Sequence, residues 1–213
     1  MSFTFKPNIK LKRADLSEEQ KKAADHIVLQ QRSGTYKAIL LEGVTGSGKT
    51  EVYFEAVAEA LKSETAQVLV LVPEISLTAQ WLERFEDRFG VAPVIWHSEM
   101  SPAQRRRAWW ATIRGEARVI VGARSALFLP LQDLKLVIVD EEHSTTFKQD
   151  EGVMYNGRDM AIMRAKLSEI PVVLGSATPS IESWKMAYHG QYLKATLKQR
   201  ASKSKLPPVK LLD

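Results

Sequence analysis

The amino-acid sequence predicts an α/β domain whose mainly parallel β-sheet is covered by helices on both faces. Two observations support this fold class: strand-length runs that are almost continuously apolar, and helical periods in the segments between them. With 213 residues, 45% of them hydrophobic and 26% charged, the chain is long enough for one full core. The predicted strands are residues 37–41, 67–72, 93–96, 117–122, 134–140 and 171–175.

Segments between these strands carry the signals of helices. Residues 50–62 follow the first strand and have a helical pattern. In residues 76–89, apolar side chains recur every four positions and Ser76 is a plausible N-cap. Residues 101–113 begin with Ser101 as a cap and a proline at the first helical position. In such a fold, ligands are expected at the carboxyl ends of the strands.

Composition excludes several classes of protein. No run of about 18 apolar residues occurs and no apolar core follows the basic N-terminus, so we expect neither a membrane span nor a secretory signal, but a cytoplasmic protein. The absence of cysteine rules out disulfides and cysteine-bound zinc, and the four histidines show no paired metal-ligand spacing. A formal net charge of +5 permits polyanion binding without requiring it.

A phosphate-binding loop is predicted at residues 43–50, "GVTGSGKT", which fit the pattern G-x-x-x-x-G-K-[ST] between a strand and a helix. Its glycines allow consecutive backbone N–H groups to wrap a triphosphate, and the helix N-terminus adds partial positive charge. Lys49 is expected to neutralise the β- and γ-phosphates, and Thr50 to ligate Mg²⁺. A flexible glycine turn is the alternative. The predicted nucleotide-binding residues of the loop are Gly43, Thr45, Gly46, Ser47, Gly48, Lys49 and Thr50.

Three acids and a histidine follow the strand "LVIVD" in the stretch "DEEH", residues 140–143. Because this strand and the phosphate loop end at the same edge of the predicted sheet, Asp140 can hold the Mg²⁺ shell and Glu141 can polarise the water that attacks the γ-phosphate. Taken alone, three acids after a strand are more often a solvated turn, and the phosphate loop reverses that balance. We therefore predict a site for ATP and Mg²⁺ with Lys49, Asp140, Glu141 and His143 as catalytic residues.

The order of these motifs resembles that of a known family. The phosphate loop, D-E-E-H and "GSATPS" at 175–180 are similar to motifs in the first motor lobe of superfamily 2 helicases. With "LVPEISLTAQ", "VGARSALFLP" and "DEEHSTTFKQDEG", the chain most resembles PriA-type primosomal helicases over residues 14–213. The resemblance implies a three-layer, RecA-like P-loop NTPase domain, ATP hydrolysis and three-prime to five-prime unwinding of stalled replication forks. It also implies forked and single-stranded DNA, primosome proteins and single-stranded-DNA-binding protein as partners.

Two roles remain open for Gln20. The resemblance implies that its amide recognises adenine, as in many motors of this kind. Alternatively, Ser17 and Gln20 form a capping box that satisfies the start of a helix.

The resemblance further implies residues that contact the DNA backbone. Ser76, Thr78, Arg124 and Ser125 lie in the two segments that touch nucleic acid in such helicases, and they can supply hydroxyl, guanidinium and backbone N–H donors to phosphates. For Ser76 the simpler role is that of an N-cap.

The polar segment after the acids, "STTFKQDEGVMYNGRD", resembles an aromatic-rich loop that contacts single-stranded DNA. Phe147, Lys148 and Tyr155 are the candidates, because an exposed aromatic ring stacks on bases with little sequence preference. Phe147 has an alternative role as an anchor that holds the loop to the core.

Coupling between ATP and DNA is implied for Ser176 and Thr178, whose hydroxyl groups are expected to form hydrogen bonds with His143 as a natural partner. The alternative for His143 is a satisfied interior histidine.

The predicted domain limits are 1–15 for an N-terminal linker, 16–197 for the helicase lobe and 198–213 for a linker toward a second lobe that this chain lacks. The arginine that stabilises the transition state comes from that second lobe in such helicases, so the isolated lobe is expected to have little or no activity. Two other functions remain open. A P-loop phosphotransferase has no reason to carry D-E-E-H or "SATPS", and retention of Lys49 and Glu141 argues against a non-catalytic nucleotide-binding interaction module.

Overall fold

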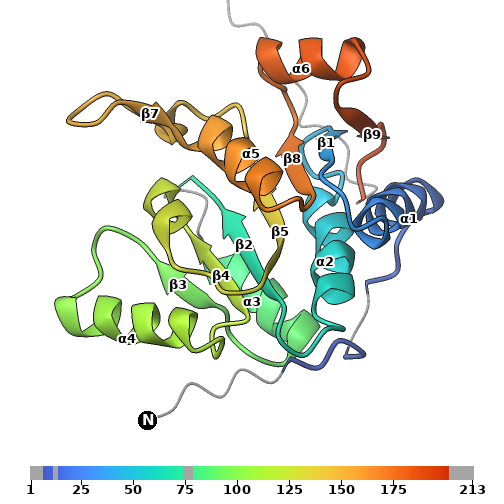
Figure 1. Cartoon of the computed structure of the whole chain (residues 1–213). Helices are drawn as coiled ribbons and strands as arrows, with labels where there is room; N and C mark the ends of the chain where they lie inside the picture. Colours follow the sequence, from blue (N-terminus) through green and yellow to red (C-terminus); the bar gives the residue numbers. More distant parts are fainter. Residues whose placement is uncertain (1–6, 12–13, 74–78, 202–213) are drawn as a thin grey trace, which may run out of the picture.

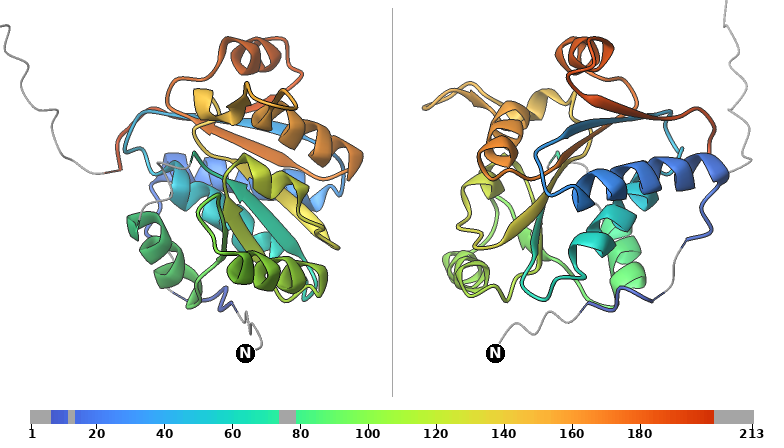
Figure 2. Two further views of the ribbon diagram at one scale, coloured as in Figure 1. Left: turned by 90° about the vertical axis from the view of Figure 1, so that its left-hand side faces the viewer. Right: turned by 45° about the vertical axis from the view of Figure 1, so that its right-hand side comes forward.

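Residues 7–11, 14–73 and 79–201 are described by the computed structural model (Figure 1). They form a seven-stranded β-sheet that lies between two layers of helices, as the right-hand view of Figure 2 shows. The predicted three-layer α/β fold with a parallel sheet is confirmed.

All pairings in this sheet are parallel, and the strand order is β3-β4-β2-β5-β8-β1-β9. A separate antiparallel pair, β6-β7, begins and ends a loop that projects from the body (Figure 1). The strands are β1 (Ala38–Gly43), β2 (Gln67–Leu71), β3 (Val94–Trp96), β4 (Val119–Gly122), β5 (Leu134–Val139), β6 (Lys148–Gln149), β7 (Tyr155–Asn156), β8 (Val172–Ser176) and β9 (Leu193–Leu197).

Six of the seven strands of the large sheet fall where the sequence predicts them. The exception is β9, "LKATL", which forms an edge of the sheet and pairs only with β1. Only Ala195 and Leu197 of its five residues are buried, so it lacks the continuous apolar run of a central strand. This difference in burial explains why periodicity did not reveal it.

Helices on the first face of the sheet are α1 (Glu18–Arg32), α2 (Lys49–Ala60) and α3 (Ala79–Phe89), and those on the second are α4 (Pro102–Ile113) and α5 (Gly157–Leu167). The helix α6 (Ile181–Tyr188) connects β8 to β9, and two 3-10 turns are η2 (Arg124–Phe128) and η3 (Thr145–Phe147). Within the described ranges, every helix is too short or too polar to span a lipid bilayer. The predicted N-cap of α3, Ser76, lies outside the described residues.

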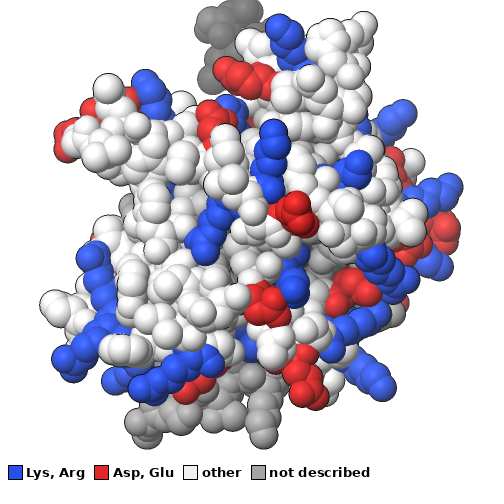
Figure 3. Space-filling model, viewed as in Figure 1, with Lys and Arg blue, Asp and Glu red and all other residues white. Residues whose placement is uncertain are grey.

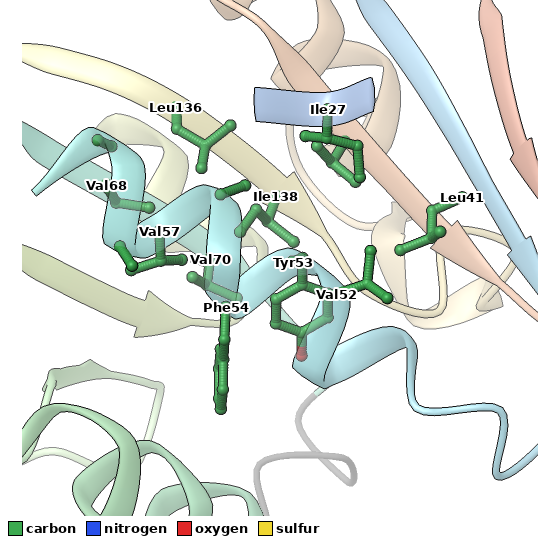
Figure 4. Close-up of a cluster of buried hydrophobic side chains, with 14 of the residues drawn as sticks. Ile27, Leu41, Val52, Tyr53, Phe54, Val57, Val68, Val70, Leu136 and Ile138 are labelled. Carbon is green, nitrogen blue, oxygen red and sulfur yellow. The ribbon is translucent and has the colours of Figure 1, made fainter. Parts of the chain in front are cut away.

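The core is divided by the sheet into one apolar cluster on each face. On the first face, α2 packs Val52, Phe54 and Val57 against side chains of β1, β2 and β5 (Figure 4). Phe54 also meets the rings of Trp81 and Phe85 edge-on, at 5.6 Å between centroids, which fixes α3 against α2.

The predicted cap of α4 is present as a complete capping box. The Ser101 hydroxyl accepts from the backbone N–H of Gln104, whose side chain accepts from the N–H of Ser101. We expect Ser101→Ala to lower the free energy of unfolding by about 1 kcal/mol, because one N–H of the first turn loses its partner. Urea denaturation measures this loss, and Ser101→Thr, which keeps a hydroxyl, is the control; equal losses in the two variants would contradict the assignment of the cap.

Candidate nucleotide-binding and catalytic site

The phosphate loop connects the carboxyl end of β1 to the first residue of α2. Gly46 and Gly48 have φ of +78° and +80°, a conformation that other L-residues rarely adopt. At Gly43, a Cβ would lie 2.4 Å from Oγ of Ser47. No side chain caps α2, so the N–H groups of its first turn are open to an anion.

Lys49 is held at the mouth of this loop although it is only 8% exposed. Its Nζ donates to the carbonyl oxygen of Gly43 at 3.1 Å and lies 3.9 Å from Oε1 of Glu141. The predicted meeting of the phosphate loop and the acids at one edge of the sheet is therefore confirmed.

Asp140 follows β5 directly and uses both of its carboxylate oxygens within the protein. Oδ2 accepts from the hydroxyl of Tyr53 at 2.9 Å, and Oδ1 accepts from the backbone N–H of Glu141 at 3.0 Å. Burial raises the pKa of Asp140, and its hydrogen bond with Tyr53 and the charge of Lys49 oppose that shift. The neighbouring Glu141 has a φ of 48°, so the backbone turns sharply between two carboxylates that face different partners.

A cleft of about 940 Å³ joins these groups. Its walls come from the residues before α1, the phosphate loop, α3, the end of β5 and the segment after β9. It is lined by Ala14, Asp15, Leu16, Ser17, Gln20, Thr45, Gly46, Gly48, Lys49, Thr50, Glu51, Gln80, Arg84, Asp140, Glu141, Gln199, Arg200 and Ala201.

The donors in this cleft fit magnesium better than a transition metal. Among the described residues, no group of three or more His, Cys, Asp or Glu side chains could enclose an ion. Magnesium is bound through one or two protein oxygens together with phosphate and water, and the Thr50 hydroxyl and the Asp140 carboxylate both line the cleft.

Gln20 is buried and forms the predicted capping box with Ser17 at the start of α1. Its remaining amide group is also engaged, because Nε2 donates to the carbonyl oxygen of Ser47 in the phosphate loop at 2.8 Å. The capping alternative is thus confirmed, and the contact with adenine stays a prediction. The side chain ties the helix cap to the phosphate loop, a link that the sequence did not reveal.

The predicted contact between His143 and Ser176 is present. Nδ1 of His143 lies 2.8 Å from Oγ of Ser176 and 3.6 Å from Oε2 of Glu141. Ser176 Oγ also accepts from the backbone N–H of Thr178 at 3.0 Å, while the Thr178 side chain is exposed. The link between the two strand ends is therefore the His143–Ser176 contact, and Thr178 joins it through its backbone N–H rather than through its hydroxyl.

Glu142, the last of the three acids, has partners that the sequence analysis did not predict. It is 2% exposed, and its carboxylate accepts from Nη1 of Arg158 at 3.3 Å, from the N–H and hydroxyl of Ser180, and from the hydroxyl of Ser183. One buried carboxylate thus joins the end of β5 to α5 and to the start of α6. The only signal in the sequence was its place next to two functional acids.

Of the three residues in the loop after the acids that are predicted to contact DNA, Phe147 is buried and the other two are at least partly exposed. Phe147 is 1% exposed and packs in the second core cluster, so the structure gives it the anchoring role rather than a stacking role. Lys148 is exposed and pairs with Asp150, and Tyr155 packs edge-on against the exposed ring of Phe128 at 5.4 Å.

Arg124 contacts the same loop from η2. Its Nη1 donates to the backbone carbonyl oxygens of Thr146 and Lys148, so the guanidinium holds the loop in place. Ser125, its neighbour, is exposed. The other two predicted backbone contacts, Ser76 and Thr78, lie outside the described residues.

Basic side chains are not confined to the cleft. On the face seen in Figure 3, Lys and Arg gather over α4 and elsewhere alternate with acids. On α4 itself, Trp109 and Trp110 are both partly exposed, and the guanidinium of Arg114 lies 5.7 Å from the centre of the Trp110 ring. Positive charge alone therefore does not locate a path for DNA.

Solved structures with the same fold include a RecG bound to a three-way DNA junction, with a TM-score of 0.67 and 20% identity over 94% of this chain and 28% of that one. Another is the Hef helicase domain of Pyrococcus furiosus, with a TM-score of 0.57 and 23% identity over 82% of this chain and 37% of that one. At these identities the likeness concerns the fold alone.

Curated relatives include replication restart proteins PriA. Those of Rickettsia felis and Bacillus subtilis are 44% and 43% identical over 93% of this chain, which covers 30% and 24% of their respective lengths. The chain thus spans less than a third of these relatives. The family model of the DEAD/DEAH box helicases matches residues 17–187, which contain the phosphate loop, the acidic stretch and the Ser176–Thr178 turn. The chain belongs to the DEAD/DEAH box helicase family.

Proposed function

We propose that the chain is the ATP-binding motor domain of a three-prime to five-prime DNA helicase that unwinds stalled replication forks and starts primosome assembly. The observation that carries this proposal is the convergence of Lys49, Asp140 and Glu141 on one cleft behind a glycine loop. Similarity to replication restart proteins along 93% of the chain supports the choice of fork DNA as substrate. A cytoplasmic location is part of the same proposal.

The roles of the cleft residues follow from their chemistry. The phosphate loop from Gly43 to Thr50 binds the triphosphate through its N–H groups, and Lys49 neutralises the β- and γ-phosphates. Thr50 and Asp140 would hold Mg²⁺, which would supply further charge neutralisation at the phosphate oxygens. Glu141 accepts the proton of the attacking water, and its distance of 3.9 Å from the Lys49 Nζ supports a position next to the γ-phosphate.

We propose that ATP hydrolysis is coupled to DNA binding through two side-chain contacts made by the acidic stretch. His143 contacts Ser176 at the end of β8, and Glu142 contacts Arg158, which starts the helix after the aromatic loop. Movement of that loop by single-stranded DNA would thus reach the acids through packed side chains. Lys148, Tyr155, Arg124 and Ser125 are the proposed DNA contacts among the described residues, and Gln20 the proposed adenine contact.

Partners beyond DNA rest on the similarity alone. The name of the relatives, replication restart protein, supports a role in DNA replication. Primosome proteins and single-stranded-DNA-binding protein are proposed as partners of the whole protein on the resemblance of its motifs. No described residue favours a phosphotransferase or an interaction module over a motor.

Lys49→Ala tests the nucleotide site directly. Loss of a charge-assisted hydrogen bond to phosphate is expected to weaken binding of ATP to this chain about 10- to 100-fold, as measured by calorimetry. The matched control is Lys62→Ala, which removes an exposed lysine paired with Glu59 at the other end of α2. Equal affinity in both variants would overturn the nucleotide site. Phosphate release that forked DNA does not stimulate, in a protein extended to the length of its relatives, would overturn the helicase.

A further inference from the structure

Tyr53 has the one polar group among the core side chains labelled in Figure 4, and it is fully buried. Its hydroxyl reaches the edge of the cluster and donates to Oδ2 of Asp140 at 2.9 Å. It also accepts from Nε1 of Trp81 at 2.7 Å. The phenol therefore touches Asp140, one of the two proposed magnesium ligands.

The direction of these hydrogen bonds follows from what each group can do. An indole N–H only donates and a carboxylate only accepts, so the single hydrogen of the phenol points to Asp140. The phenol thus holds Oδ2 of Asp140, while the backbone N–H of Glu141 holds Oδ1. Each carboxylate oxygen keeps a further lone pair for another partner.

The phenol cannot easily move away from this position. Its ring lies in the core cluster between α2 and the sheet, and Trp81, which fixes the hydroxyl, stacks on Phe85 within α3 at 5.5 Å. Three elements, α2, α3 and the end of β5, thus meet at one oxygen atom. A hydroxyl held this rigidly restricts the rotation of the two side chains that it contacts.

We propose that Tyr53 is a positioning residue of the magnesium site, which orients the Asp140 carboxylate toward the ion, and that Trp81 keeps it in place. The inference rests on the proposed function, because it assigns Tyr53 to the site where ATP and Mg²⁺ bind. It predicts that replacing Tyr53 weakens the binding of Mg²⁺ but leaves the binding of nucleotide without metal unchanged.

The test separates metal from nucleotide binding in the 213-residue chain. Affinity for a fluorescent ADP analogue is measured in EDTA and then over a Mg²⁺ titration, and bound Mn²⁺ is measured by electron paramagnetic resonance. Tyr53→Phe is expected to leave the affinity in EDTA within about twofold and to raise the Mg²⁺ midpoint about 10-fold or more, as loss of an outer-shell partner does at other metal sites. Mn²⁺ affinity should fall by a similar factor.

Two further variants guard against a purely structural effect. Trp81→Phe leaves the phenol in place without its donor and should shift the Mg²⁺ midpoint in the same direction by a smaller factor. Tyr36→Phe removes a half-buried hydroxyl in the second core cluster and should shift nothing. An unchanged midpoint in Tyr53→Phe, or equal weakening with and without Mg²⁺, would overturn the proposal. Should Tyr53→Phe not fold, an unchanged midpoint in Trp81→Phe would overturn it.

Failure of this inference is distinguishable from failure of the proposed function. Thr50→Ala and Asp140→Asn remove the proposed ligands themselves. If these two shift the Mg²⁺ midpoint and the Tyr53 and Trp81 variants do not, only the positioning role fails. If nucleotide binding by the unmodified chain shows no dependence on Mg²⁺, the site and the inference fail together.

Discussion

Replacing Glu141 with glutamine is expected to lower the rate of ATP hydrolysis about 10²- to 10⁴-fold, the usual contribution of a general base. The amide keeps the size of the side chain but cannot accept a proton from water. Nucleotide should remain bound, because the phosphate loop and Lys49 are unchanged. The measurement is DNA-stimulated phosphate release in a protein extended to the length of its relatives, together with nucleotide affinity by calorimetry.

Glu116→Gln is the matched control, since Glu116 precedes β4 at the opposite edge of the sheet and pairs only loosely with Arg114 at 3.9 Å. Its phosphate release should equal that of the unmodified protein. If the Glu141→Gln variant hydrolyses ATP at the normal rate, a group other than Glu141 acts as the base. A variant that no longer binds nucleotide would show that Glu141 has a structural role instead.

Replacing Glu142 with alanine is expected to lower the free energy of unfolding by about 3–5 kcal/mol. The change leaves the guanidinium of Arg158 buried without its inner carboxylate, and it removes the acceptor of three donors from Ser180 and Ser183. The start of α6 loses its tie to β5 as well. Urea denaturation followed by circular dichroism measures the loss.

The control for this variant is Asp159→Ala. Asp159 pairs with the same Arg158, at 2.8 Å from Nε, but its side chain is largely exposed. Exposed ion pairs contribute about 0–1 kcal/mol, so the control should lose little. Losses of similar size in both variants would show that burial does not distinguish the two acids.

Central elements were predictable from the sequence because each leaves a strong local pattern. The inner strands β1, β2, β4, β5 and β8 are almost entirely buried, so their apolar runs are nearly continuous, and the glycines and lysine of the phosphate loop occur at fixed spacing. Parallel geometry then predicted that Lys49 and Glu141 would meet. The edge strand β9 leaves no comparable pattern.

Partners across the fold were not predictable, because they depend on how helices pack on the sheet. Nothing next to Glu142 in the chain indicates that Arg158 and Ser183 would surround it, and nothing next to Tyr53 indicates Asp140. Arg124 illustrates the same limit, since nothing next to it in the chain indicates that its guanidinium donates to carbonyl groups of the loop. Residue type suggested the chemistry of these groups, and only tertiary packing determined their partners.

The pairing of β1 has a consequence for biosynthesis. Both neighbours of this strand come from the far end of the chain, because Ala38 pairs with Val172 in β8 and Ile39 pairs with Leu193 in β9. During translation β1 therefore stays unpaired along both edges until nearly the whole domain has been synthesised. The nascent phosphate loop has no supporting strand until then, so capture of nucleotide would report the completion of folding.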